Sequence, residues 1–224
     1  MNYLVNNIYG CVQGEGCNAG LPMVMLRLHG CGVGCPWCDT KETWEVELQN
    51  ERLTIKEVLG SSPFYTTKTE LEITDYITGN FLKFKWILIS GGEPARYTLK
   101  PLVYSLQQAG YKVALETSGT ELGHVGAGID WVCISPKIDM PGGKKVISEA
   151  FREADEIKHV IGKLADLEAL NNLLSQVAPY LCKEVQICLQ PVSQSEKATK
   201  LCIDEVQKRG WRLSVQLHKY INVD

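Results

Sequence analysis

Short runs of apolar and β-branched residues alternate along the chain with stretches of helical periodicity. Leu and Val recur at positions 167, 170, 173, 174 and 177, the spacing of a helix, and Pro179 follows as its stop. Patterns in which Ser or Thr precedes Glu by three residues predict further helix starts at Thr54, Thr67 and Ser193. The six apolar runs, bounded by Gly, Pro or Ser, are predicted strands: residues 23–28, 86–90, 112–116, 131–135, 156–161 and 184–189.

This alternation predicts an α/β fold with a parallel sheet and right-handed crossovers. Six strands are too few for a complete eight-fold barrel, so we expect a partial, open parallel β/α barrel. The 224 residues are expected to form a single domain over 1–224, with a variable insertion at about 41–84, a segment that carries no motif. In such a sheet, chemistry takes place at the C-terminal ends of the strands.

Charge and composition add only the exclusion of some classes of partner and cellular location. Lys and Arg number 23 against 26 for Asp and Glu, a formal charge of −3, so we expect no general attraction to nucleic acid or to an anionic membrane. The first ten residues lack the basic start and apolar run of a signal peptide, and no apolar run could span a bilayer. We therefore expect a soluble, cytoplasmic protein, in which clustered cysteines point to a metal and not to disulfides.

Three of the nine cysteines, Cys31, Cys35 and Cys38, stand in one C-x3-C-x2-C segment directly after a predicted strand. A structural zinc site normally takes four protein ligands, and no fourth Cys or His lies nearby in the sequence. Three thiolates on a four-iron cluster would instead leave one iron open to a small molecule. The alternatives are a zinc loop completed by a distant ligand, or free thiols.

The spacing of these cysteines is the signature of the radical S-adenosylmethionine (SAM) superfamily, and Gly91-Gly92-Glu93-Pro94 resembles the superfamily segment that approaches the amino group of SAM. The finer motifs resemble one family within it, 7-carboxy-7-deazaguanine synthase, nearly from end to end. These motifs are QGEG at 13–16, RLHG at 27–30, CDT at 38–40, SGGEP at 90–94, ETSG at 116–119, SPK at 135–137, LQP at 189–191 and LHKYIN at 217–222.

The resemblance implies a radical SAM lyase that rearranges 6-carboxy-5,6,7,8-tetrahydropterin to 7-carboxy-7-deazaguanine with loss of ammonia, in queuosine and 7-deazapurine biosynthesis. Hydrogen abstraction at C6 would start the ring contraction, and SAM would be regenerated. The implied cofactors are a 4Fe-4S cluster, SAM and Mg²⁺. The implied partners are the pterin substrate, an electron donor such as a flavodoxin, and a second copy of the chain in a homodimer.

The resemblance also implies roles for individual residues. Arg27 would grip the substrate carboxylate bidentately, unless it only forms a surface salt bridge, and Thr40 would offer its hydroxyl to Mg²⁺ with substrate oxygens and water, unless it is a cap. Val12, Gln13, Gly14 and Ser90 are expected to contact the pterin. Contacts to SAM are expected from Trp37, Asp39, Gly92, Glu93, Glu116, Ser118, Ser135, Pro136, Lys137, Gln190, Pro191, Val192 and Ser193.

Two other functions stay open at this point. One is a radical-SAM activase that installs a glycyl radical on another protein, and the other is a non-catalytic zinc-binding module. His159 is expected to be a core residue, and His218 and Lys219 could help to close the pocket. The six cysteines outside the motif are expected to be ordinary thiols: Cys11, Cys17, Cys133, Cys182, Cys188 and Cys202.

Overall fold

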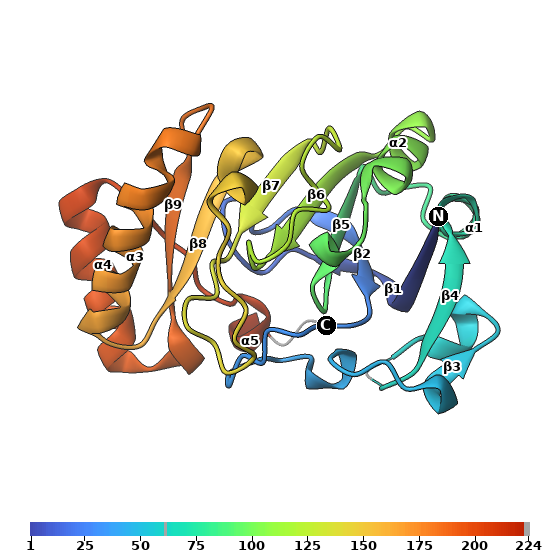
Figure 1. Cartoon of the computed structure of the whole chain (residues 1–224), viewed down its shortest axis with the longest axis horizontal. Helices are drawn as coiled ribbons and strands as arrows, with labels where there is room; N and C mark the ends of the chain where they lie inside the picture. Colours follow the sequence, from blue (N-terminus) through green and yellow to red (C-terminus); the bar gives the residue numbers. More distant parts are fainter. Residues whose placement is uncertain (61, 222–224) are drawn as a thin grey trace.

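The computed structural model, which describes residues 1–60 and 62–221, is built on one curved, ten-stranded sheet (Figure 1). Its strand order is β10-β9-β8-β7-β6-β5-β2-β1-β4-β3, so the two ends of the sheet do not meet. The strands are β1 (Asn2–Val12), β2 (Pro22–Leu28), β3 (Glu51–Arg52), β4 (Tyr65–Thr69), β5 (Trp86–Gly91), β6 (Lys112–Thr117), β7 (Trp131–Ile134), β8 (Glu156–Ile161), β9 (Gln186–Pro191) and β10 (Arg212–Leu213).

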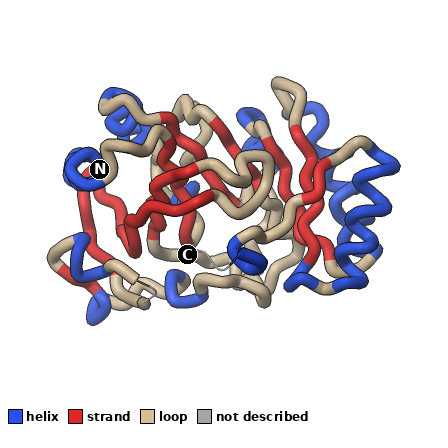
Figure 2. The backbone as a smooth tube through the Cα atoms, turned by 180° about the vertical axis from the view of Figure 1, so that it is seen from behind, coloured by secondary structure: helices blue, strands red, loops and turns tan. Residues whose placement is uncertain are grey.

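The predicted open parallel barrel is confirmed. The six expected strands are β2 and β5 to β9, and each pairs in parallel with its neighbour in the sheet. Helices cover the outer face, with α3 and α4 beside β8 and β9 (Figures 1 and 2). The helices are α1 (Glu70–Asn80), α2 (Lys100–Gln108), α3 (Leu164–Val177), α4 (Glu196–Arg209) and the short α5 (His218–Ile221). None of these described helices is long and apolar enough to cross a membrane.

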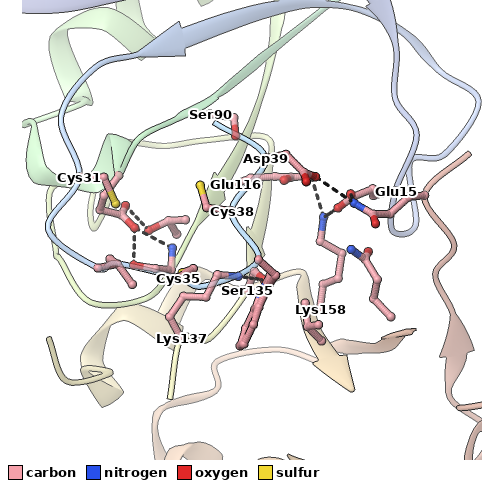
Figure 3. A pocket seen from close by; sticks show the side chains of 18 of the residues that line it. Glu15, Cys31, Cys35, Cys38, Asp39, Ser90, Glu116, Ser135, Lys137 and Lys158 are labelled. Atoms are coloured by element: carbon pink, nitrogen blue, oxygen red, sulfur yellow. Dashed lines mark hydrogen bonds and ion pairs between the residues drawn. The ribbon is translucent and has the colours of Figure 1, made fainter. Parts of the chain in front are cut away.

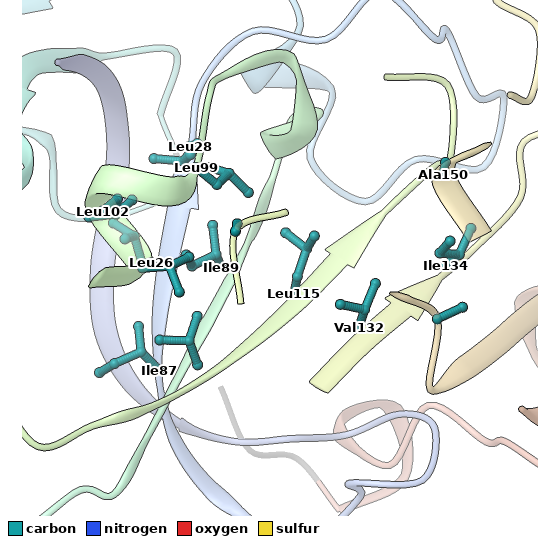
Figure 4. Packing of buried hydrophobic residues seen from close by; sticks show 14 of the residues in the cluster. Leu26, Leu28, Ile87, Ile89, Leu99, Leu102, Leu115, Val132, Ile134 and Ala150 are labelled. Atoms are coloured by element: carbon teal, nitrogen blue, oxygen red, sulfur yellow. The ribbon is translucent and has the colours of Figure 1, made fainter. Parts of the chain in front are cut away.

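Alternation along the parallel strands separates two buried faces. Ile87 and Ile89 of β5 pack outward against helix residues such as Leu102, in the main hydrophobic core (Figure 4). Leu88, between them, belongs to a smaller apolar cluster with Met23 and Ala114 on the opposite face. Because both faces are covered, these strands read as near-continuous apolar runs. Full burial of each such side chain stabilises the fold by roughly 1.5–3 kcal/mol.

Strand β1 was missed by the pattern analysis. It pairs antiparallel with both β2 and β4 and so extends the parallel sheet at one edge. Its alternation is interrupted where the register with β2 shifts between Val5 and Asn7. Asn6, at this bulge, is buried and donates to the backbone oxygens of Ser62 and Phe64. Two polar residues in the middle of the strand hide its period of two from the sequence.

The segment 41–84 is continuous with the same fold. It contains 3-10 turns, the short β3, then β4 and α1. Ile55, Ile73 and Ile77 from this segment are part of the main core, and β4 hydrogen-bonds to β1. The segment therefore contributes part of its apolar residues to the main core, although others, such as Leu48 and Leu53, are exposed.

Helix starts were predicted with mixed success. Thr54 and Glu57 form the expected capping box, although it opens a short 3-10 turn (Ile55–Val58). Thr67 is wrong as a cap, because it is still paired with Leu4 in the sheet, and Thr69 caps α1 instead. Ser193 is also wrong: Ser195 caps α4 by accepting from the amide of Ala198. The predicted helix over residues 167–177 is α3.

We predict that Thr69→Ala lowers the free energy of unfolding by about 1 kcal/mol, since the Thr69 hydroxyl accepts from the amide of Glu72 at 3.3 Å. Thr67→Ala is the matched control, because it removes only a hydrogen bond to the exposed side chain of Glu51. Urea unfolding followed by circular dichroism measures both variants. Equal losses in the two would contradict the assignment of the cap.

Candidate active site

The C-terminal ends of the parallel strands surround a cavity of about 990 Å³, its open mouth included (Figure 3). On the inner face of the sheet, apolar residues give way there to polar ones: Leu88 is followed by Ser90, Ala114 by Glu116, and Cys188 by Gln190. Lys158 and Ser135 complete this polar ring from β8 and from the end of β7. The floor of the barrel is therefore apolar and its upper end is polar.

Cys31, Cys35 and Cys38 all line this cavity. Their loop is held by backbone bonds from Gly30 to Thr43 and from Cys31 to Trp44. Burial, with smaller effects of the neighbouring Glu93, Cys35 and Cys38, raises the pKa of the Cys31 thiol to about 11. The Cys38 sulfur accepts N–H donors from the Thr40 backbone and the Trp44 indole, both at 3.4 Å. Three thiols that line one cavity fit an iron–sulfur cluster, because thiolates are the usual ligands of such clusters.

The end of β5 approaches the cysteine loop through backbone alone. Gly92 donates to the carbonyl of Leu28, and a Cβ at Gly92 would collide with the carbonyl of Gly30. Any other residue would push the two segments apart. The Glu93 carboxylate turns away from this contact and is fully engaged, accepting from the amides of Ala95 and Ser118 and from the hydroxyls of Thr117 and Ser118.

A buried lysine connects three parts of the site. The Lys158 ammonium, whose side chain is 3% exposed, lies 2.5 Å from Glu15 and 3.0 Å from Glu116. Burial by itself would raise the pKa of the Glu15 carboxyl, but the charge of Lys158 and hydrogen bonds from Lys158 and Gln216 outweigh it and lower that pKa to about 2. Burial likewise opposes the charge on Lys158, yet Glu116 and Glu15 raise its pKa well above the usual value. Glu15 and Lys158 are therefore both ionised at neutral pH.

Arg27 is next to this ring but outside the cavity lining. It pairs in register with Ser90, and its guanidinium donates to the Tyr9 hydroxyl at 2.9 Å. Its Nε is buried without a hydrogen-bond partner, and among the described residues no carboxylate lies within ion-pair distance of it. A half-buried guanidinium without an anion is ready to receive one.

The other predicted site residues fall into two groups. Thr40, Val12, Gln13, Gly14 and Pro136 do not line the cavity, although the Gln13 side chain reaches Glu116 at 3.0 Å. The remaining residues assigned to SAM or substrate do line it: Trp37, Asp39, Ser90, Gly92, Glu93, Glu116, Ser118, Ser135, Lys137, Gln190, Pro191, Val192 and Ser193.

Comparison with known proteins adds independent information. A family model described as a 4Fe-4S single cluster domain matches residues 12–141. The chain is 39% identical to 7-carboxy-7-deazaguanine synthase of Escherichia coli strain K12, over 100% of both chains. It is 33% identical to the protein of the same name from Flavobacterium psychrophilum, over 95% of this chain and 88% of that one. The crystal structure of QueE from Escherichia coli matches with a TM-score of 0.88 and 38% identity, over 97% of this chain and 95% of that one.

The chain belongs to the 7-carboxy-7-deazaguanine synthase family. Membership in this family confirms the resemblance carried by the motifs. The family match favours the synthase interpretation over the two alternatives, a glycyl-radical activase and a zinc-binding module.

Several residues at the site of this family member escaped the sequence analysis. Glu15 lies inside the QGEG motif at 13–16, but only Gln13 and Gly14 of that motif were predicted to contact the substrate. Lys158 and Gln216 belong to none of the motifs, although Lys158 is a charged residue inside the predicted strand 156–161. The C-terminal tail supplies Gln216 and Lys219 to the lining, and Gln216 donates to Glu15 at 2.7 Å. Asn222, the last residue of the tail motif, lies outside the described residues.

His159 behaves as expected for a core residue. It is 7% exposed, and burial lowers its pKa to about 4. Lys219 lines the cavity and lies 3.5 Å from Asp39, at the mouth. His218 lies against Gly14 instead, because a Cβ at Gly14 would be 2.7 Å from its ring.

We predict a stability profile controlled by Glu15. Its pKa is lower in the folded chain, about 2, than the ordinary value of 4.5. Its ionised form therefore stabilises the fold fully above pH 4.5, and this contribution disappears as the pH falls toward 2. Urea unfolding of the cluster-free chain should show that Glu15→Gln is clearly less stable than wild type at pH 7, with the difference narrowing below pH 4.5. Glu149→Gln, at an exposed carboxylate, is the control, and a difference that stays constant with pH would refute the role of Glu15.

Proposed function

We propose that the protein is a radical SAM lyase that converts 6-carboxy-5,6,7,8-tetrahydropterin to 7-carboxy-7-deazaguanine with loss of ammonia. The observation that carries this proposal is the convergence of three cysteine thiols and the Gly91-Gly92 strand end on one cavity. The names of the relatives, over the full length of the chain, support the same reaction.

In this proposal Cys31, Cys35 and Cys38 hold a 4Fe-4S cluster. When bound, the cluster and SAM supply the one-electron chemistry that removes a hydrogen atom from the substrate. Gly92 lines the cavity next to the cysteine loop, where its backbone can contact the amino acid end of SAM. Lys137 stands on the same wall of the cavity, with its ammonium 2.5 Å from the Ser135 hydroxyl, where it can attract a carboxylate. The described residues therefore offer both a cradle and a countercharge for SAM.

The substrate would lie between Arg27 and the polar ring. Arg27 has free donors for the pterin carboxylate, and Ser90, its register partner, lines the cavity beside it. The carboxylates of Glu15 and Glu116 can accept hydrogen bonds from the amino and ring N–H groups of the pterin. Lys158 holds both of these acceptors in place through ion pairs, and the Gln13 amide donates to Glu116 from the side.

We also propose a magnesium site at Thr40, an electron donor such as a flavodoxin, and a homodimer. Thr40 lies beside the cluster loop, with its hydroxyl 3.6 Å from the Cys38 sulfur. One hydroxyl is too little for Mg²⁺, which prefers six oxygen ligands, so substrate oxygens and water would have to complete the shell.

The decisive experiment is anaerobic turnover of reconstituted protein with SAM, a reductant and 6-carboxytetrahydropterin. Mass spectrometry should detect 7-carboxy-7-deazaguanine and ammonia release. Cleavage of SAM without any pterin product would refute the proposed substrate and reopen the activase alternative.

For the cluster, we predict that Cys31→Ala, Cys35→Ala or Cys38→Ala abolishes iron and sulfide binding. Cys202→Ala is the control, because this buried thiol on α4 lies outside the cavity lining and should leave the cluster intact. Iron and sulfide analysis after anaerobic reconstitution compares the four variants. Full loading in any loop variant would overturn the assignment.

For magnesium, we predict that Mg²⁺ raises turnover in wild type without changing the iron content. Thr40→Ala should blunt this response because it removes the hydroxyl ligand, whereas Thr40→Ser should keep it. Initial rates measured over a range of Mg²⁺ concentrations test the pair. An unchanged magnesium dependence in Thr40→Ala would remove Thr40 from the site.

For the substrate, we predict that Arg27→Lys lowers kcat/KM by roughly thirty-fold or more, equivalent to about 2–5 kcal/mol, because Lys keeps the charge but not the bidentate geometry. SAM binding and slow SAM cleavage without substrate should survive. Tyr9→Phe, which removes only the hydroxyl beside the guanidinium, should have a smaller effect. Near-normal kcat/KM for Arg27→Lys would mean that another residue binds the carboxylate.

A further inference from the structure

Below the active site, three potential metal ligands meet that the proposed reaction does not use. Cys17 comes from the loop after β1, Glu156 from the start of β8 and Cys188 from β9. Their ligand atoms all lie within 4.8 Å of one another, and the two sulfurs are 3.6 Å apart. Cys17 and Cys188 are 171 positions apart in the sequence, so only the tertiary structure brings the three residues together.

The carboxylate of Glu156 is held with one oxygen left over. The residue is 2% exposed, and its Oε2 accepts from the amide of Cys17 at 3.0 Å and from the indole of Trp131 at 3.3 Å. Its Oε1 is buried, and none of the described residues forms a hydrogen bond with it. A carboxylate oxygen inside a protein is unfavourable without such a bond and is therefore available to bind a cation. Gly16 leaves room for this carboxylate, because a Cβ there would collide with Oε1.

The spacing of the ligands suits zinc. Two thiolates on a tetrahedral zinc, each at about 2.3 Å from the ion, lie about 3.8 Å apart. The 3.6 Å between the sulfurs of Cys17 and Cys188 is close to that value and far from a disulfide bond, which needs about 2.05 Å. Cys17 is partly exposed, so an ion can reach the site from solvent.

We propose that Cys17, Glu156 and Cys188 form a second metal site, which binds Zn²⁺ through two thiolates and one carboxylate with water in the fourth position. Binding releases the two thiol protons to solvent and transfers no electrons. Without a metal, burial and the nearby Glu156 carboxylate raise the pKa of both thiols. The zinc ion therefore replaces the two protons that the sulfurs carry in the metal-free protein.

The position of the site suggests a structural role. Residues 13–16, directly before Cys17, carry Gln13 and Glu15 to the polar ring of the cavity. A zinc ion would fasten this loop to β8 and β9 from below. This proposal does not depend on the reaction assigned to the cavity above.

The test uses the holoenzyme, so that the three cluster cysteines are already occupied. The reconstituted protein is incubated anaerobically with zinc sulfate and desalted, and zinc, iron and sulfide are measured by mass spectrometry and colorimetry. Wild type should retain about one zinc per chain in addition to its iron. Cys17→Ser and Cys188→Ser should lose it at unchanged iron content, with Cys182→Ser, at an exposed thiol, as the matched control.

Affinity and stability sharpen the result. Zinc affinity is measured in competition with a chromogenic zinc indicator, and Glu156→Gln should bind zinc more weakly than wild type. Trp131→Phe removes the hydrogen bond that orients the carboxylate and should lower the zinc affinity by roughly ten- to a hundred-fold. Zinc should raise the thermal midpoint of wild type but not that of Cys17→Ser.

Wild type that retains no zinc would overturn the proposal. Equal retention in wild type and in the two Cys→Ser variants would overturn it as well, since the ion would be elsewhere. So would a Cys17–Cys188 disulfide in the anaerobically purified protein. The wild-type measurement decides the question even if a variant folds poorly.

Discussion

The buried ammonium of Lys158 is the constraint around which the upper half of the barrel is arranged. A charge inside a protein is strongly unfavourable unless it is paired and hydrogen-bonded. Glu15 and Glu116 meet this requirement from the loop after β1 and from β6, while Lys158 itself comes from β8. One cation therefore holds together three segments that are far apart in the sequence, and it fixes two carboxylates at the cavity wall.

The same part of the barrel depends on a second constraint, the close approach of two backbones. The loop that carries the cysteines and the strand end at Gly91-Gly92 touch without intervening side chains. This contact brings thiols and strand-end backbone to one cavity wall. The Glu93 carboxylate then fixes the strand end by accepting four hydrogen bonds from residues of β6 and the turns beside it. Glu93 acts through these bonds to hold the shape of the loop.

The positions of charged and apolar residues in this cavity suit a cofactor-dependent enzyme. The hard chemistry belongs to a cluster and SAM, and the protein has to position them and orient the substrate. The polar ring provides fixed charges of both signs: carboxylates on one side, and Lys137 on the wall with the cysteines. Arg27 is poised beside this ring with unused donors. The apolar floor of Met23, Leu88 and Ala114 keeps the lower half of the barrel closed.

The sequence by itself determined the local features of this protein. Six parallel strands, the α3 helix and the cysteine loop are written in short-range patterns, because apolar runs, helical periodicity and C-x3-C-x2-C spacing involve neighbouring residues. The family could be recognised for the same reason. Tertiary structure decided the rest. Pairing with β2 and β4 made a strand of residues 2–12 despite the polar pair at Asn6 and Asn7. Tertiary contacts gave Lys158 its role, because its ion-pair partners Glu15 and Glu116 are 143 and 42 positions away in the sequence. Only the tertiary structure brings Cys17 to Cys188, because the distance between two side chains that are remote in the sequence depends on the fold and not on a local pattern.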